Sequence, residues 1–197
     1  MLIATDITGT LYFWRKTNNA KSPSYCTWTG GTFVTNNESQ VADPNSIIQT
    51  GQGFFVEAKR AEATLIFNNK QRDLNTAGKF FKVKQQIVER NTIWLNATDL
   101  AGTGNFSQMA VGYITDATQG VDFYDGMYYN DGTLSLNSYL DNTKYVIQGR
   151  ALPFDSSDIV PLSFSSSIAG EYSIALDHVD GLFTGTQDIF YWMSLQI

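Results

Sequence analysis

The stretch VGYITDATQGVDFYDGMYYNDG, residues Val111 to Gly132, decides how the chain is interpreted. It begins as an apolar run and passes into a segment where glycine, aspartate and asparagine recur every few residues. These residue types favour turns, because glycine tolerates positive φ and Asp and Asn bond their own backbone. A strand that ends in a turn-rich loop, without helical periodicity, indicates a β protein.

The same pattern of short strands and turns recurs along the rest of the chain. Most of the β-rich runs are bounded by Gly, Pro, Asn or Asp, and we predict strands at 8–14, 27–34 (two short pieces around Gly30 and Gly31), 53–58, 63–67, 79–83, 92–97, 108–115, 134–139, 144–149, 159–164, 171–176 and 189–195. The close spacing of the third and fourth runs predicts a hairpin. No amphipathic helix of about ten residues is visible. The sequence therefore predicts an all-β fold, a β-sandwich or jelly roll of about a dozen short, mostly antiparallel strands. We expect one domain over residues 1–197.

Composition excludes several classes of partner. The chain is 43% hydrophobic, so it can fill a core, but only 16% charged, with a formal net charge of −6. The few Lys and Arg residues are scattered, which argues against nucleic acid and anionic membrane surfaces, since both need clustered cations. No apolar window of about 18 residues exists, so we expect no membrane insertion.

Cys26 and His178 are the sole cysteine and the sole histidine. An internal disulfide is therefore impossible, and zinc sites built from several Cys or His side chains are excluded within one chain. The opening MLIATDITGT lacks the basic and long apolar regions of a signal peptide. If the protein is secreted, we expect its signal on a segment outside this sequence.

Four aspartates of the opening stretch are candidate metal ligands: Asp116, Asp122, Asp125 and Asp131. Calcium takes six to eight oxygens from carboxylates, carbonyls and waters held in a loop, so calcium is the candidate cofactor. The spacing differs from that of an EF-hand, which needs alternate acidic residues and a closing Glu. The alternative is that these aspartates only shape β-turns.

Aromatic residues near turns are candidate ligand-binding groups. Exposed Tyr and Trp rings present a flat apolar face with a polar edge, which suits sugar rings. The candidates are Tyr124, Tyr128 and Tyr129, with Tyr12, Trp14, Tyr25 and Trp28 in comparable surroundings. The alternative is core packing. We predict core positions for Phe54, Phe55, Phe67, Phe80, Phe81 and Trp94.

Catalytic residues are not identified from the sequence. His178 is flanked by Asp177 and Asp180, but a histidine base needs a nucleophile within reach and no G-x-S-x-G elbow exists. A histidine in a turn between strands is the simpler interpretation. A hydrolase of this composition would use a calcium-polarised carbonyl or water, for instance on an ester or lactone.

A series of phrases resembles a known module. The phrases are GTLYFW (9–14), GQGFFVEA (51–58), FNNKQR (67–72), IWLN (93–96), VGYITDATQGVDFYDG (111–126), YVIQGRALPFDSSDIVPL (145–162) and AGEYSIALDHVDGLF (169–183). Their order resembles a β-sandwich module that precedes the C-terminal sorting domain in secreted and surface proteins of Bacteroidetes, exported by the type IX (Por) secretion system. Such modules accompany adhesins and carbohydrate-active enzymes, and no catalytic residues come with the resemblance.

The resemblance implies a secreted or cell-surface location, and three candidate functions remain open. The first is a non-catalytic accessory module that binds glycans, another small molecule or neighbouring domains. The second is the calcium-dependent ester or lactone hydrolase, and the third is a structural spacer. Similar modules continue beyond Asp188 with another strand, so the chain is expected to be a fragment shortened at its C-terminal end. An edge strand left exposed in this way predicts a homodimer.

Overall fold

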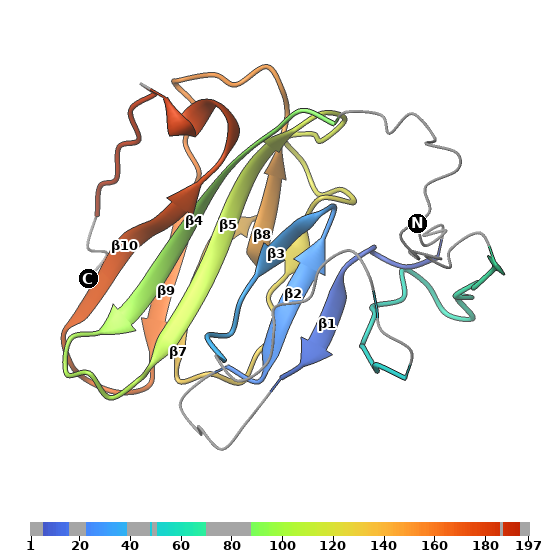
Figure 1. The fold of residues 1–197 in the computed structure, drawn as a ribbon, viewed down its shortest axis with the longest axis horizontal. Coiled ribbons are helices and arrows are strands. Elements are labelled where there is room, and N and C mark those ends of the chain that lie inside the picture. The colour runs from blue at the N-terminus through green and yellow to red at the C-terminus, as the bar shows by residue number, and fades with distance from the viewer. Residues whose placement is uncertain are drawn as a thin grey trace, which may run out of the picture.

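The computed structural model describes residues 6–15, 23–38, 48, 51–69, 88–185 and 187–193. These residues form ten β-strands and no α-helix, which confirms the all-β prediction. No helix among them is long and apolar enough to cross a membrane. The strands belong to a small antiparallel sheet and a larger sheet that curls into a half-barrel (Figure 1).

The small sheet contains three strands in sequence order: β1 (Leu11–Trp14), β2 (Tyr25–Thr29) and β3 (Thr32–Val34). Gly30 and Gly31, both at positive φ, make the tight turn between β2 and β3. Leu11, Phe13 and Cys26 form an apolar cluster on this sheet.

The larger sheet has the strand order β10-β4-β5-β8-β7-β9, with the short β6 paired to β8. Its strands are β4 (Arg90–Asp99), β5 (Phe106–Ile114), β6 (Gly126–Met127), β7 (Leu134–Leu140), β8 (Thr143–Arg150), β9 (Leu162–Ser166) and β10 (Tyr172–Val179). All pairs are antiparallel except β5 and β8, where Ala110 lies opposite Ile147. A 3₁₀ turn, η2 (Gly181–Thr184), follows β10 and buries Phe183.

Two apolar clusters cover the two faces of the larger sheet. One cluster lies inside the curl and includes Met109, Leu136 and Phe183. The other joins Val34 of β3 to Trp94 of β4 and Ile147 of β8, so the small sheet packs on that face. Strand β5 is buried along its whole length because both of its faces are covered.

The predicted hairpin over 53–58 and 63–67 is wrong in its pairing. Phe55 exchanges two main-chain hydrogen bonds with Tyr12 of β1, at 3.0 and 2.8 Å. The turn that follows is held by Asp6, whose carboxylate accepts from Arg60 and from the Thr64 N–H. The N-terminal segment therefore takes the place of the local partner. Residues 189–193 form no strand, and the strand predicted at 79–83 lies outside the described residues.

Candidate functional site

Asp122 organises the loop that follows β5. Its Oδ2 accepts a hydrogen bond from the Thr118 N–H at 2.6 Å, and its Oδ1 accepts one from the Tyr124 N–H at 2.8 Å. The second bond, two residues along the chain, is the bond by which an Asp side chain stabilises a turn. Both oxygens thus hold the backbone of the loop in place.

Asp125 fastens the same loop to both sheets. Its side chain is buried, Oδ2 accepts from the Asp122 N–H at 2.6 Å, and Oδ1 accepts from the Gly149 N–H of β8 at 3.0 Å. Its carbonyl accepts from Thr10 Oγ1, just before β1, at 3.2 Å. Burial raises the pKa of the Asp125 carboxyl to about 7. The negative charge of Asp122 also raises this pKa, whereas the two N–H hydrogen bonds lower it.

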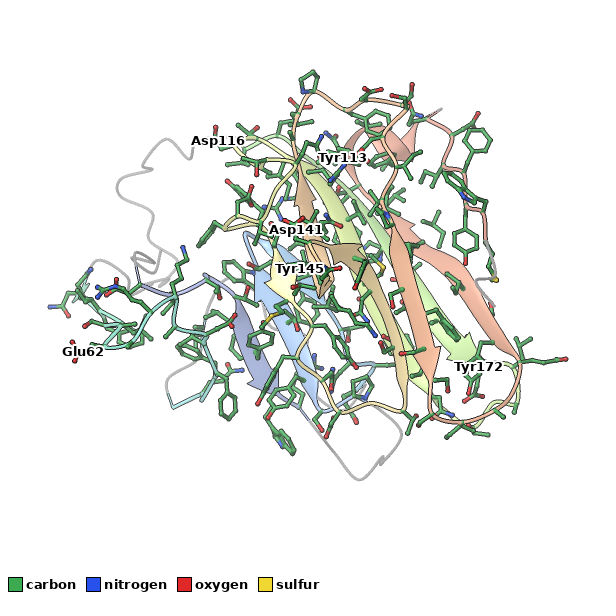
Figure 2. All side chains as sticks on the ribbon, turned by 180° about the vertical axis from the view of Figure 1, so that it is seen from behind. Glu62, Tyr113, Asp116, Asp141, Tyr145 and Tyr172 are labelled. Carbon is green, nitrogen blue, oxygen red and sulfur yellow. The ribbon has the colours of Figure 1, made fainter. Side chains whose placement is uncertain are left out.

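Asp131 and Asp116 lie in other surroundings. The two oxygens of Asp131 accept from the Ser24 N–H and hydroxyl, at 3.0 and 2.7 Å, at the start of β2. Asp116 is exposed at positive φ in the turn directly after β5, at the same end of the molecule as Tyr113 (Figure 2). Asp122 and Asp125 therefore hold one loop, Asp131 holds the start of β2, and the four aspartates do not converge on one point.

Metal binding by these aspartates stays a prediction. Within the described ranges, no group of three or more His, Cys, Asp or Glu side chains is arranged to hold a metal ion. Only Asp122 and Asp125 are brought together, and their carboxylate oxygens already accept backbone N–H groups. A calcium ion would need further ligand oxygens from carbonyls and waters.

Tyr124 and Tyr128 are half-buried and have packing roles. Tyr124 fills the space beside two glycines, so closely that a Cβ atom added to Gly149 would lie 2.5 Å from the Tyr124 Cβ; its ring likewise abuts Gly30. Tyr128 packs against the cluster between the sheets. Burial raises the pKa of both hydroxyls.

Tyr129, the third candidate, belongs to a group of surface rings. Its ring centroid lies 5.1 Å from that of Tyr25, and Tyr25 in turn lies 5.2 Å from Trp14 and 5.8 Å from Phe55. Beneath them is the buried Tyr12, 5.3 Å from Tyr129. We call Trp14, Tyr25, Phe55 and Tyr129 the aromatic patch.

The aromatic patch is exposed to an unusual degree for its residue types. Trp14 is 56% exposed, Phe55 54% and Tyr129 48%. Single exposed apolar side chains are common on protein surfaces, but contiguous apolar patches often mark binding sites. Tyr12 supports the patch from below, since its hydroxyl donates to the Met127 carbonyl at 2.9 Å.

A small hollow of about 10 Å³ adjoins the aromatic patch, and that volume suits about one water molecule. Tyr25 and Tyr129 belong both to the patch and to the walls of the hollow. Hydrogen bonds fix the other walls: Asn130 Nδ2 donates to the Tyr25 carbonyl at 3.0 Å, and Gln108 Oε1 accepts from the Thr35 N–H at 2.9 Å.

Sequence reasoning found most of the aromatic patch but not its boundary. It singled out Tyr12, Trp14, Tyr25 and Tyr129 as aromatics near turns, and the structure brings these four together. Its core prediction for Phe55 is wrong, because consecutive residues of an extended segment point to opposite sides. The sequence could have indicated this, because two consecutive aromatic residues in an extended segment, Phe54 and Phe55, cannot both face the core.

The remaining core predictions have mixed outcomes. Trp94 is buried and donates its indole N–H to the Phe33 carbonyl at 2.8 Å, as expected for a core tryptophan. Phe54 packs on the cluster of the small sheet, together with Trp28. The prediction for Phe67 is wrong, since it is 64% exposed. Phe80 and Phe81 lie outside the described residues.

The sequence suggested that His178 lies in a turn between strands. This is wrong, because His178 lies on β10. A β-bulge at this point lets it stack on Trp94, with the ring centroids 4.1 Å apart, while its Nδ1 contacts Asp177 Oδ2 at 2.6 Å. Asn96 Nδ2 also donates to Asp177, at 2.7 Å. Among the described residues, the hydrogen-bond partner of the His178 ring is the Asp177 carboxylate and not a serine.

Comparison with known proteins identifies a family but no activity. A model of the family described as a domain of unknown function (DUF8693) matches residues 3–192. No curated protein and no solved structure matches the chain. Because the match covers nearly the whole sequence, the chain belongs to the DUF8693 family.

Proposed function

We propose that the chain is a non-catalytic accessory module that binds glycans at the aromatic patch. The observation that carries the proposal is the meeting of three rings, from three separate stretches of sequence, around Tyr25, with these three about half exposed. Rings of this kind stack against the C–H faces of sugars, and their hydroxyl or indole edges bond sugar hydroxyls.

The backbone hydrogen bonds that hold the aromatic patch also support the proposal, because they make it a preformed binding surface. Trp14 and Tyr25 lie opposite each other in the β1–β2 register, so their positions are set by a ladder of hydrogen bonds. Phe55 is held by its exchange of main-chain bonds with Tyr12. A ligand that meets a rigid surface loses less free energy to ordering of the protein.

We further propose a secreted or cell-surface location in a larger bacterial protein. The resemblance to modules that precede the sorting domain of type IX secreted proteins supports it, through the order of phrases from residue 9 to residue 183. In that setting the module would hold a glycan near the neighbouring domains of the same protein. Fractionation of the native host, with an antibody against the chain, tests the location; a purely cytosolic signal would contradict it.

Glycan-array screening followed by calorimetric titration tests the binding function. The variants Trp14→Ala and Tyr129→Ala should each weaken binding of the best ligand at least about tenfold, which corresponds to about 1.4 kcal/mol. The matched control is Tyr139→Ala, because Tyr139 is 40% exposed but belongs to neither the aromatic patch nor the hollow. Near-UV circular dichroism of each variant verifies folding.

Two results would contradict the proposal. The first is binding that patch variants and the control reduce equally, which would locate the ligand elsewhere. The second is an array and titrations in which the wild-type protein binds no glycan, which would favour the structural spacer.

A further inference from the structure

We infer that the aromatic patch takes a single soluble chain of neutral sugars, and neither a flat crystalline polysaccharide nor an anionic one. This inference rests on the proposed function and narrows the class of ligand. Three independent features of the site carry it: the inclination of the rings, the charges that act on them, and the size of the hollow.

The rings do not share a plane. Trp14 and Phe55 each make an angle of 81° with Tyr25, and Tyr129 makes one of 56° with it. A crystalline polysaccharide presents a plane, on which only coplanar rings can stack together. Rings inclined to Tyr25 by 56° to 81°, at centroid distances of 5.1 to 5.8 Å from it, instead suit a single chain that is contacted from more than one side.

Two carboxylates act on tyrosines in and beneath the patch. Burial raises the pKa of the Tyr25 and Tyr12 hydroxyls, and the negative charges of Asp131 and Glu57 add to the shift at Tyr25 and Tyr12 respectively. None of the residues of the patch or the hollow is Lys or Arg. These negative charges disfavour uronates and sulfated sugars at the patch, whereas neutral sugars meet no such repulsion.

The hollow limits the group that can enter it. Its volume suits about one water-sized group, which is the size of a sugar hydroxyl. Asn130 and Gln108 line it with their amide groups held in place by hydrogen bonds, so it is not expected to widen easily. Plain hydroxylated pyranoses match these dimensions.

Titration with three kinds of probe tests the inference. The probes are soluble neutral hexasaccharides (gluco-, manno- and xylo-oligosaccharides), soluble oligouronates of the same length, and suspended crystalline cellulose and chitin. The wild-type protein should bind at least one neutral hexasaccharide at least tenfold more tightly than any oligouronate. It should not co-sediment with either crystalline polymer.

A charge variant provides the matched control. Glu57→Gln keeps the size of the side chain and removes one negative charge, so it should lower the preference for neutral over anionic chains about twofold or more at low salt. Binding of the neutral chain should remain sensitive to Trp14→Ala. Thermal melting of both variants verifies that they are folded.

The outcomes separate this inference from the proposed function. Binding to crystalline polymer or to oligouronates that Trp14→Ala abolishes would overturn the inference and leave the glycan-binding function standing. A Glu57→Gln variant with an unchanged preference would overturn the electrostatic part of the inference. Failure of the wild-type protein to bind any of the three probes would overturn the inference, and a glycan array that is also without a ligand would overturn the proposed function.

Discussion

Replacing Asp125 with asparagine is expected to remove a dependence of stability on pH. Burial raises the pKa of this carboxyl from its ordinary 3.8 to about 7, so near pH 5 the folded state holds a proton that the unfolded chain has released. Stability then decreases as the pH rises towards 7 and becomes constant above it, because proton binding favours the folded state. Asparagine has a similar shape and does not titrate.

The size of the effect follows from the two pKa values. A rise from 3.8 to about 7 corresponds to about 4 kcal/mol, since each tenfold change in proton affinity is worth about 1.4 kcal/mol. Roughly 3 kcal/mol of this falls between about pH 5 and pH 8, because the rest has been lost below pH 5. The asparagine amide can accept only one of the two N–H bonds, from Asp122 or Gly149, which adds a cost that does not vary with pH.

Urea unfolding at a series of pH values, followed by tryptophan fluorescence, measures the effect. The difference in unfolding free energy between wild type and Asp125→Asn should change by about 3 kcal/mol between about pH 5 and pH 8, in favour of the variant. The control is Asp99→Asn: hydrogen bonds from Thr103 and Asn105 lower the pKa of Asp99 to about 2, so its difference should not vary in this interval. A constant difference for Asp125→Asn would refute the reasoning and show that two N–H donors keep the carboxylate ionised.

Three further predictions concern other parts of the fold. Gly149→Ala should lower the unfolding free energy by about 1–3 kcal/mol in urea titrations, because the new Cβ would lie 2.5 Å from the Tyr124 Cβ; an unchanged midpoint would show that the loop can move away. Asp122→Ala should lower the melting temperature by the same amount with and without millimolar calcium, since Asp122 supports the loop through backbone N–H groups; a loss that appears only with calcium would instead support the predicted metal site. In sedimentation, the protein should dimerise through β10, which pairs with β4 alone among the described strands, and Leu176→Lys should weaken the dimer; a monomer at high concentration would contradict this.

Local pattern was sufficient to predict the fold class. The β-rich runs at 92–97 and 108–115 became β4 and β5, because their residues alternate between the inside of the curl and the face under the small sheet. Turn residues likewise marked where strands end. The pairing of Phe55 with Tyr12 was missed, because a partner more than 40 positions away leaves no trace in a short window of sequence.

The candidate site was predictable only in part, for the same reason. Tyr124, Tyr128 and Tyr129 lie within one short stretch, yet only Tyr129 reaches the surface group, while the other two fill space between the sheets. Their proximity in the sequence suggested one common role, but the path of the backbone places the three tyrosines in different surroundings. The aspartates show the same limit, since neighbours in sequence hold different segments of backbone.

The parallel pairing of β5 with β8 has a consequence for how fast the protein folds. Ala110 can meet Ile147 only after the intervening chain, including the loop of Asp122 and Asp125, has closed back on itself. In such non-local pairing the chain loses entropy on closing the loop before it gains the favourable energy of the strand contacts. This order slows folding. Asp125 accepts hydrogen bonds from the Gly149 N–H and from Thr10 across this junction. The loop therefore stabilises the non-local pairing of β5 with β8. Substitutions there are expected to retard refolding more than those in the β4–β5 hairpin, whose strands are neighbours in the chain.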